Sequence, residues 1–463
     1  MEAFVNAASF GFAPEATGLD NARALQNALD QGGTIVVSRP GVYKLARTVY
    51  IGSYTTLVFG NGITVQKQDE EGPFCHVILN KGALTKTYDT RIAIENLHIV
   101  VNGMDIRKFE VFGLHGQLAF FYVRDLRIER FRCLDLGKMQ YAIHICTFED
   151  VIVRDAIIKG DKDGVHLGRG RRFHISECVF ETYDDAVALN AHDYDVGNPE
   201  LGWIEDGVVE NCRDLARDEA NEGAVGFFCR ILAGGWSDWR PGMEVQKSDT
   251  VVSAGRLYRV KADPDATVYV SHTQPVHEHG IEVLDGISWA MVQDDVTYTA
   301  GVRNVTFRNI SLGKARIGFS IHFDNDKYSR SYYPGSPVPS QEQLMFDHIR
   351  VLHDHKKPLL RINTPVDALL VTRASLKDSN ILFEGNRAMD DYLPTAVSLL
   401  GCVFRHPGEW DVVENRVPNK AITLQTAASV VMDASFVARV QPGPGTIRAA
   451  SDLPGLQPVM GAE

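Results

Sequence analysis

A short pattern of alternating apolar and polar residues recurs along most of the chain and constrains its fold more than any other feature. The pattern is an apolar residue, any residue, a polar residue that is most often Asn or Asp, an apolar residue, any residue and an apolar residue. Clear copies are Ile94–Ile99, Val123–Ile128, Val153–Ile158, Ile175–Phe180 and Phe307–Leu312, and weaker copies are Val209–Asp214, Phe346–Val351 and Val371–Leu376. Alternation with a period of two predicts strands, and copies about 22 to 39 residues apart predict the coils of a solenoid with loops of different length.

The fold predicted from this repeat is all-β: a right-handed parallel β-helix, which is a single-stranded solenoid. A β-sandwich also has many short strands, but the Asn-Gly and Asp-Gly turns of hairpins do not separate the copies here. Because each coil packs only on its neighbours, a solenoid can extend through a chain of 463 residues as one domain. We therefore expect the β-helix domain to comprise residues 1–240 and 300–440, with coils from about residue 34 to 435.

Two segments lack the repeat. Residues 241–299 contain three strand-like runs joined by Gly and Asp turns, at Asp249–Val252, Gly255–Val260 and Asp285–Trp289. This segment predicts a small inserted β module outside the coils. Residues 441–463 are rich in Pro, Gly and Ala and predict an irregular tail.

The N-terminal segment predicts a capping helix for the solenoid. Asp20 is a candidate N-cap, and Gly32-Gly33 would end the helix. Four apolar residues share one helical face, namely Ala24, Leu25, Ala28 and Leu29. An amphipathic helix of this kind can cover the open end of a solenoid.

Four acidic residues occupy two strand-like stretches about one repeat apart. Asp161 and Asp163 lie in Gly160–Leu167, and Asp184 and Asp185 lie in Tyr183–Asn190. Acidic residues at the same point of successive coils should gather on one surface, where repulsion between like charges raises at least one carboxyl pKa. A protonated acid beside an ionised one is the pairing that glycosidic bond hydrolysis requires. Turn-forming Asp pairs at strand edges are the alternative explanation.

Histidine and tryptophan residues near these strands are candidates for contact with a sugar. The alternation around His144 and His166 predicts that both side chains point outward from the core, either toward the cleft or in a simple surface stack. Trp236 and Trp239 follow a later strand, and flat indole rings stack well on pyranose rings; burial under a loop is the alternative for each. Clustered carboxylates could also bind calcium, although we predict no metal and no cofactor.

The net charge limits the classes of binding partner, and the cysteine content indicates the cellular compartment. A net charge of −12 argues against nucleic acid or an anionic membrane as the main partner. The seven cysteines show no CxxC spacing, and Cys178 and Cys212 occupy apolar positions of the repeat. This usage favours a reducing compartment such as the cytoplasm. The sequence shows no signal peptide or membrane-spanning run, but a secreted protein after signal removal would give the same picture.

The N-terminal segment resembles the opening of pectate-lyase-superfamily β-helix proteins. The resemblance is carried by the helix, Gly32-Gly33, the apolar strand Thr34–Val37, Pro40-Gly41-Val42-Tyr43 and the strand Thr56–Gly60. It implies the β-helix fold. It does not define the activity, because the superfamily contains lyases, hydrolases, epimerases and phage tailspikes.

At the acidic strands the resemblance narrows to the polygalacturonase-type glycoside hydrolases of family 28. Asp161-Lys162-Asp163-Gly164 stands where that family has Asn-Thr-Asp-Gly, and Tyr183-Asp184-Asp185-Ala186 stands where it has Gly-Asp-Asp-Cys one coil later. The resemblance implies that Asp184 or Asp185 protonates the leaving oxygen, while Asp163 and the other aspartate activate water, with inversion. An inverting pair of carboxyl groups is expected about 6.5–9.5 Å apart.

The chain then departs from the family pattern. Family members have Gly-His-Gly on the next coil and Arg-Ile-Lys beyond it, whose cations hold a uronate. Here Gly226–Ile231 contains no histidine, and Arg230-Ile231-Leu232 keeps only Arg230 of the basic pair. This departure favours a neutral sugar over polygalacturonate.

Three functions remain open. The leading hypothesis is a glycoside hydrolase with Asp163, Asp184 and Asp185 as catalytic residues and Asp161, His144, His166, Arg230, Trp236 and Trp239 as substrate-binding residues. A polysaccharide lyase, with or without calcium, would need a strong base, for which Arg230 is the obvious candidate. A tailspike or adhesin that binds glycan without turnover is the third, favoured by segment 241–299, which resembles chitin-binding-type modules with a Gly-x-Leu-Tyr strand and a late Trp. The sugar, its linkage and the oligomeric state are not defined by the sequence.

Overall fold

The computed structural model describes residues 4–106, 108–194, 197–216, 226–261, 268–324, 330–377, 379–386, 393–404, 412–426 and 446–449. The chain forms two compact units: the first is Met1–Ala188 with Gly207–Gly226, and the second is Leu189–Asp206 with Phe227–Glu463. Nearly all regular structure in the described residues is β, with a single α-helix. None of the described helices is long and apolar enough to span a membrane.

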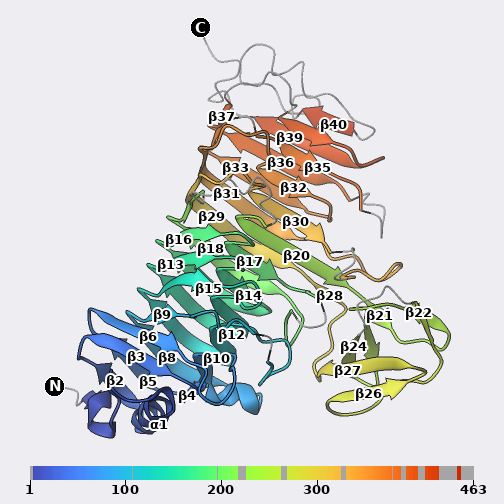
Figure 1. The fold of residues 1–463 in the computed structure, drawn as a ribbon. Coiled ribbons are helices and arrows are strands. Elements are labelled where there is room, and N and C mark those ends of the chain that lie inside the picture. The colour runs from blue at the N-terminus through green and yellow to red at the C-terminus, as the bar shows by residue number, and fades with distance from the viewer. Residues whose placement is uncertain are drawn as a thin grey trace. The chain divides into compact units, whose positions relative to one another are not determined.

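The first unit consists of coils whose strands stack in parallel (Figure 1). One ladder contains β2 (Gly33–Val37), β5 (Thr55–Phe59), β8 (Asp89–Glu95), β10 (Leu118–Glu129), β12 (Ile143–Arg154) and β15 (Gly170–Ser176). A second contains β3 (Gly41–Leu45), β6 (Ile63–Lys67), β9 (His98–Val100), β11 (Arg132–Leu136), β13 (Ile157–Gly160), β16 (Val179–Thr182) and β19 (Arg213–Asp214). A third joins β4 (Val49–Ile51), β7 (Ile78–Asn80), the starts of β10 and β12, and β14 (Val165–Leu167).

The polar position of the repeat has one structural role in all eight copies. Its residue adopts a left-handed backbone, with φ between 49° and 58°, at Asn96, Asp125, Asp155, Glu177, Asn211, Asn309, His348 and Arg373. Asn and Asp tolerate this conformation better than other residues with a side chain, which explains their frequency at this position. The flanking apolar residues are buried, so each copy is a bend between two inward-facing strand segments.

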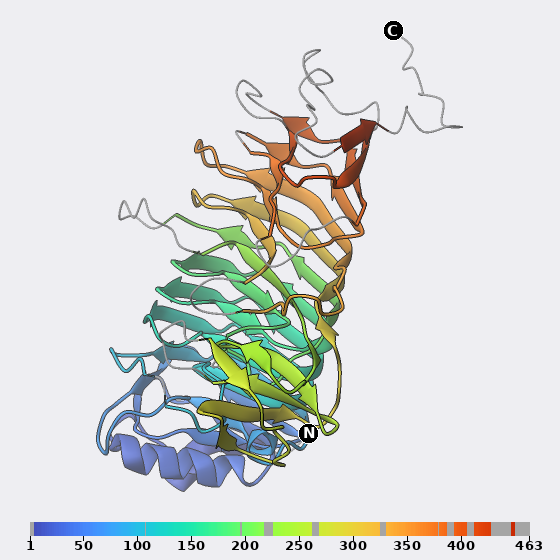
Figure 2. The same ribbon diagram turned by 90° about the vertical axis from the view of Figure 1, so that its right-hand side faces the viewer.

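The N-terminal helix is present, but its cap differs from the prediction. Helix α1 (Gly18–Leu29) buries the predicted apolar face and lies against β3 and β4, at the start of the coils (Figure 2). Its N-cap is Thr17, whose hydroxyl accepts a hydrogen bond from the Asp20 N–H, so Asp20 lies in the first turn. An N-cap hydroxyl that reaches the third helical N–H satisfies a donor that the helix itself leaves open, so Thr17 takes the role predicted for Asp20.

The second unit continues the same design. One ladder contains β20 (Cys229–Gly235), β30 (Phe319–Phe323), β32 (Leu360–Ile362), β35 (Ile381–Phe383) and β38 (Val413–Asn415). Another contains β29 (Val302–Leu312), β31 (Glu342–Val351), β33 (Ala368–Thr372), β36 (Thr395–Leu400), β39 (Ala421–Thr426) and β40 (Thr446–Ala449). Strand β40 falls within the segment predicted as a tail, and the other residues of 441–463 lie outside the described residues.

The second unit also contains the small β module, which stands apart from its coils (Figure 1). Five strands form one sheet in the order β21 (Ser237–Asp238), β23 (Thr250–Ser253), β24 (Arg256–Val260), β27 (Ile287–Gln293) and β26 (Ile281–Leu284). A two-stranded sheet pairs β22 (Met243–Val245) with β25 (Tyr269–Ser271). The module has its own apolar core around Tyr258 and Trp289, and its two ends are joined where β20 pairs in antiparallel fashion with β28 (Thr299–Ala300). All-β coils, a capping helix and an inserted module confirm the predicted fold class.

Candidate active site

The predicted carboxyl cluster lies in the first unit, between strands of successive coils. Asp163 precedes β14, and Asp184 and Asp185 precede β17 (Val187–Asn190). The two segments are held together by the Gly164 N–H, which donates to the Asp185 carbonyl at 2.9 Å. One carboxylate oxygen from each of Asp163, Asp184 and Asp185 lies within 4.8 Å of the other two, and Asp163 and Asp185 are buried while Asp184 is partly exposed. The structure therefore brings the three predicted catalytic residues together.

A glycine permits this close packing. Gly226 lies so near to the Asp184–Asp185 peptide that an added Cβ would be 2.3 Å from the Asp184 carbonyl carbon and 2.6 Å from the Asp185 nitrogen. Contacts this short with backbone atoms cannot be relieved by rotating a side chain. Any larger residue at position 226 must displace the segment that carries the two carboxyl groups.

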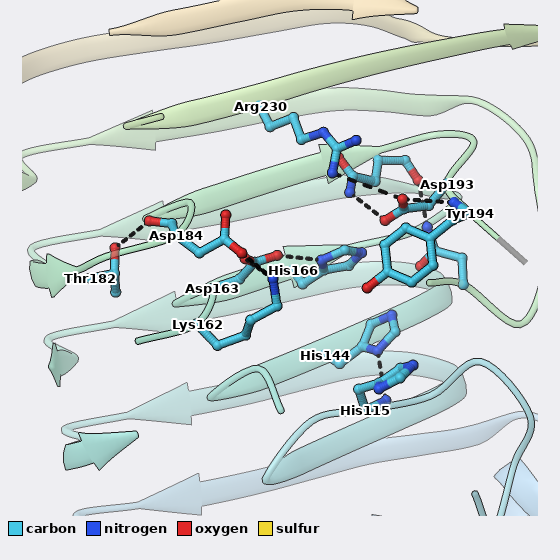
Figure 3. Close-up of polar contacts among 12 residues, drawn as sticks. His115, His144, Lys162, Asp163, His166, Thr182, Asp184, Asp193, Tyr194 and Arg230 are labelled. Carbon is cyan, nitrogen blue, oxygen red and sulfur yellow. Dashed lines mark hydrogen bonds and ion pairs between the residues drawn. The ribbon is translucent and has the colours of Figure 1, made fainter. Parts of the chain in front are cut away.

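Lys162 supplies a positive charge to the cluster, and no pattern in the sequence singles it out. Its ammonium group contacts Asp184 Oδ2 and lies 3.8 Å from Asp163 Oδ1 (Figure 3). It also lies 5.8 Å from the centre of the Tyr141 ring. An ammonium group in contact with a carboxylate favours the ionised carboxylate, because the opposite charges attract. Lys162 thus places one positive charge beside the Asp184 and Asp163 carboxylates.

His166 connects the cluster to a group of buried aromatic rings. Its Nδ1 lies 2.8 Å from Asp163 Oδ2, and the Tyr141 ring stacks on the imidazole with centroids 4.1 Å apart and an interplanar angle of 10°. His144 is in register with His166, with ring centroids 4.6 Å apart, and its Nδ1 accepts from the His115 N–H (Figure 3). Both His144 and His166 are fully buried, which corrects the expected position facing an open cleft.

Asp161 is not part of the three-carboxylate group found among the described residues. Its backbone N–H donates to the Leu136 carbonyl of the preceding coil at 2.9 Å. The side chain is partly exposed. Of the four predicted acidic residues, three cluster and Asp161 does not.

The remaining predicted site residues belong to the second unit. Arg230, on β20, forms an ion pair of 2.8 Å with Asp324 and lies 3.9 Å from Asp193. Trp236 is fully buried and donates its indole N–H to the Thr297 carbonyl, so it has no exposed face for a sugar, which corrects the prediction. Trp239 packs on the module core, donates to Ser271 Oγ at 2.8 Å and remains partly exposed.

The cluster is suited to proton transfer. It combines three carboxyl groups with an ammonium and an imidazole, so neighbouring acids experience different local charges. The same three carboxylates could supply oxygen ligands for a divalent cation. Lys162 already contacts Asp184, however, so an incoming cation would compete with the ammonium group for that oxygen.

These features define a right-handed parallel β-helix protein. Two structures of the tailspike protein of E. coli bacteriophage HK620 in complex with a pentasaccharide are similar to this chain. A mutant tailspike gives a TM-score of 0.53 at 11% identity, covering 97% of this chain and 78% of that chain. The other gives 0.51 at 10% identity, with 96% and 78% covered. A hyperthermoactive exopolygalacturonase from Thermotoga maritima gives 0.47 at 13% identity, with 94% and 93% covered.

No family model matches the sequence, and no curated protein matches it. At these identities the structural likeness establishes the fold alone. The chemistry of the site is therefore argued from the residues of this chain.

Proposed function

We propose that this protein is a glycoside hydrolase that cleaves a poly- or oligosaccharide by carboxylate acid–base catalysis. The observation that carries the proposal is the group of three carboxyl groups within 4.8 Å, of which one is in contact with an ammonium group. Glycosidic hydrolysis needs one carboxyl group to give a proton and another to act as an ionised base or nucleophile. Unequal local charge is what separates those two roles.

The contacts support a different catalytic role for each aspartate of the cluster. Asp184, held ionised by Lys162, acts on water or on the anomeric carbon. Asp163 and Asp185 are 3% and 2% exposed, and burial favours the neutral form of a carboxyl group. Asp163 lies beside the His166 imidazole, so Asp185 is the proposed donor of the proton to the leaving oxygen. Asp163 is oriented by His166 and supports the ionised partner.

One oxygen from each of the three carboxyl groups lies within 4.8 Å of the other two. The separation between whole carboxyl groups, roughly 6.5–9.5 Å in inverting and roughly 5–5.5 Å in retaining enzymes, is a different quantity and stays a prediction. The stereochemical course is therefore part of the test. Proton NMR of the first product, recorded before mutarotation, distinguishes inversion from retention.

A carbohydrate partner has further support. Both tailspike structures that share the fold were solved in complex with a pentasaccharide. The partly exposed Trp239 and the module around it could add surface for a glycan in the second unit. Binding without turnover and lyase activity are the alternatives that the experiment must separate.

The test replaces Asp163, Asp184 and Asp185 singly by Asn and measures reducing-sugar release on a panel of neutral and acidic glycans, with and without a chelator. General acid–base assistance is typically worth about 10² to 10⁴ in rate, so each variant should lose at least about a hundredfold in turnover while remaining folded. Losses in double variants should be well short of additive, because the residues serve one transition state. Asp150→Asn is the matched control, since Asp150 is an exposed aspartate of the same unit that pairs with Arg172.

Three outcomes would overturn the assignment as a glycoside hydrolase. Turnover within about threefold of the parent in all three variants would remove these residues from catalysis. A product with an unsaturated ring, detected by its ultraviolet absorbance, would identify a lyase. Glycan binding with no product on the whole panel would leave a binding protein.

A further inference from the structure

Three residues on successive coils of the second unit stand at one register position. Arg230 on β20 pairs with Ser320 on β30, and Ser320 pairs with Arg361 on β32. Residues in register on neighbouring parallel strands project from the same face of the sheet, at the strand spacing of about 4.8 Å. Two guanidinium side chains therefore flank a serine on one face of this unit.

Arg361 carries a positive charge and is partly buried. One of its terminal nitrogens donates to Ser320 Oγ at 3.2 Å, and its guanidinium carbon lies 5.2 Å from the centre of the Phe227 ring. Its Nε is buried and has no hydrogen-bond acceptor among the described residues. Burial, together with the positive charge of Arg230, lowers the pKa of Arg361, and Glu384 opposes this shift. A buried N–H donor without an acceptor costs folding free energy unless an acceptor fills the position.

The neighbouring groups do not supply that acceptor. Asp324 and Asp193 are both engaged near Arg230, at 2.8 and 3.9 Å. His322 is buried with its Nδ1 3.0 Å from Ser320 Oγ, and its pKa is held well below the usual value by burial and by Arg230 and Arg361. No ion pair of Arg361 is found in the described part of the chain. Arg361 is thus placed to receive an anion from outside.

We propose that Arg361, with Ser320 and Phe227, forms a binding site for an anionic substituent of a glycan, either a carboxylate or a sulfate. A planar guanidinium binds either group through paired N–H donors, and Ser320 Oγ, which accepts from one terminal nitrogen of Arg361, orients the guanidinium. The partly exposed Phe227 ring provides apolar surface beside it. In the sequence, only Arg230 of the family's basic pair is present, which favours a neutral sugar, but the fold places a second guanidinium, that of Arg361, two coils beyond Arg230. The inference rests on the proposed function only in taking the ligand to be a glycan.

Binding is measured by isothermal titration calorimetry in the Asp184→Asn background, which slows cleavage of the probe. The probes are trigalacturonate, a sulfated chondroitin tetrasaccharide and neutral maltotriose. At least one anionic probe should bind at least tenfold more tightly than maltotriose, and whichever of the two binds identifies carboxylate or sulfate. Arg361→Met should weaken that binding at least tenfold. Arg361→Lys should restore only part of it, because an ammonium lacks the paired donors.

Arg308→Met is the control, because Arg308 is half-exposed on the same unit and its loss should leave binding within twofold. Circular dichroism and thermal melting confirm that each variant is folded. Maltotriose binding as tight as that of both anionic probes, full affinity in Arg361→Met, or no binding of any probe overturns the site. None of these results bears on turnover in the Asp163, Asp184 and Asp185 variants, so the two proposals fail independently.

Discussion

Replacing Lys162 by Met tests the electrostatics of the carboxyl cluster directly. The change removes the ammonium group that contacts Asp184 and lies 3.8 Å from Asp163, while it keeps an unbranched side chain of similar length. The Lys162 and Asp184 side chains are only 18% and 24% exposed, so solvent screens the pair less than it screens a surface ion pair. The substitution should therefore affect protonation more than packing.

The expected size follows from the charge that is lost. An opposite charge within about 4–6 Å favours an ionised carboxylate by about 1–3 pKa units. Without the ammonium group, the cluster holds its proton to a higher pH, and the ionised base that hydrolysis requires forms later in the titration. The acidic limb of kcat/KM against pH should then move upward by about 1–3 pH units, with a lower rate at neutral pH.

The assay is a pH profile of kcat/KM on a glycan that the panel identifies, for the parent, Lys162→Met and Lys159→Met. Lys159 lies on β13 and pairs with Glu181, which is not one of the three clustered aspartates. Its replacement therefore removes an ammonium group from the same coil without altering the cluster. Its profile should match the parent. An acidic limb in Lys162→Met that stays within about 0.3 unit of the parent, or that moves downward, would refute the assigned role of Lys162.

Two further predictions concern the packing of Gly226 and the buried charge of Lys67. Gly226→Ala should reduce turnover at least tenfold, because the new Cβ would lie 2.3–2.6 Å from the Asp184–Asp185 backbone. Gly385→Ala is the control and should leave turnover unchanged, because an added Cβ there would meet no atom within 4 Å. Equal activity in the two variants would contradict the packing argument. Burial lowers the pKa of Lys67 from 10.5 to about 8 in the folded protein. Between pH 8 and 10.5 the folded state therefore loses the Lys67 proton while the unfolded state keeps it, so the stability of the folded state rises with pH in this range. The free energy of unfolding of the parent minus that of Lys67→Met, measured in urea, should therefore rise by about 3 kcal/mol between pH 8 and 10.5, and a flat or falling difference would contradict it.

The fold was accessible from the sequence because its signal is local and repeated. Each copy places apolar residues on both sides of a polar one, and each polar residue takes the same left-handed conformation, from Asn96 to Arg373. Asp163 could be placed near Asp184 and Asp185 for the same reason, because the repeat length brings them to adjacent coils. The cap at Thr17 was missed because Thr17 and Asp20 both suit the first turn of a helix, and only the backbone geometry separates them.

Other site residues depend on contacts that a local pattern does not encode. Lys162 lies in the turn before β14, where strand alternation no longer predicts direction, so its approach to Asp184 left no signal. Trp236 is covered because its indole meets the Thr297 carbonyl, 61 residues away, across the base of the module. Arg361 aligns with Arg230 only when the length of every intervening loop and of the inserted module is known.

The left-handed bends have a consequence for how such chains change over time. At each bend the requirement falls on a single backbone angle, which Asn or Asp satisfies readily but which Glu177, His348 and Arg373 also adopt. The neighbouring positions require only an apolar side chain. Few sites therefore demand a specific amino acid, and substitutions can accumulate along the coils without altering their path. Descendants of one ancestral β-helix can lose all recognisable sequence similarity while their backbones still superpose. The evolutionary relationship among them is therefore better preserved in the backbone structure than in the amino-acid sequence.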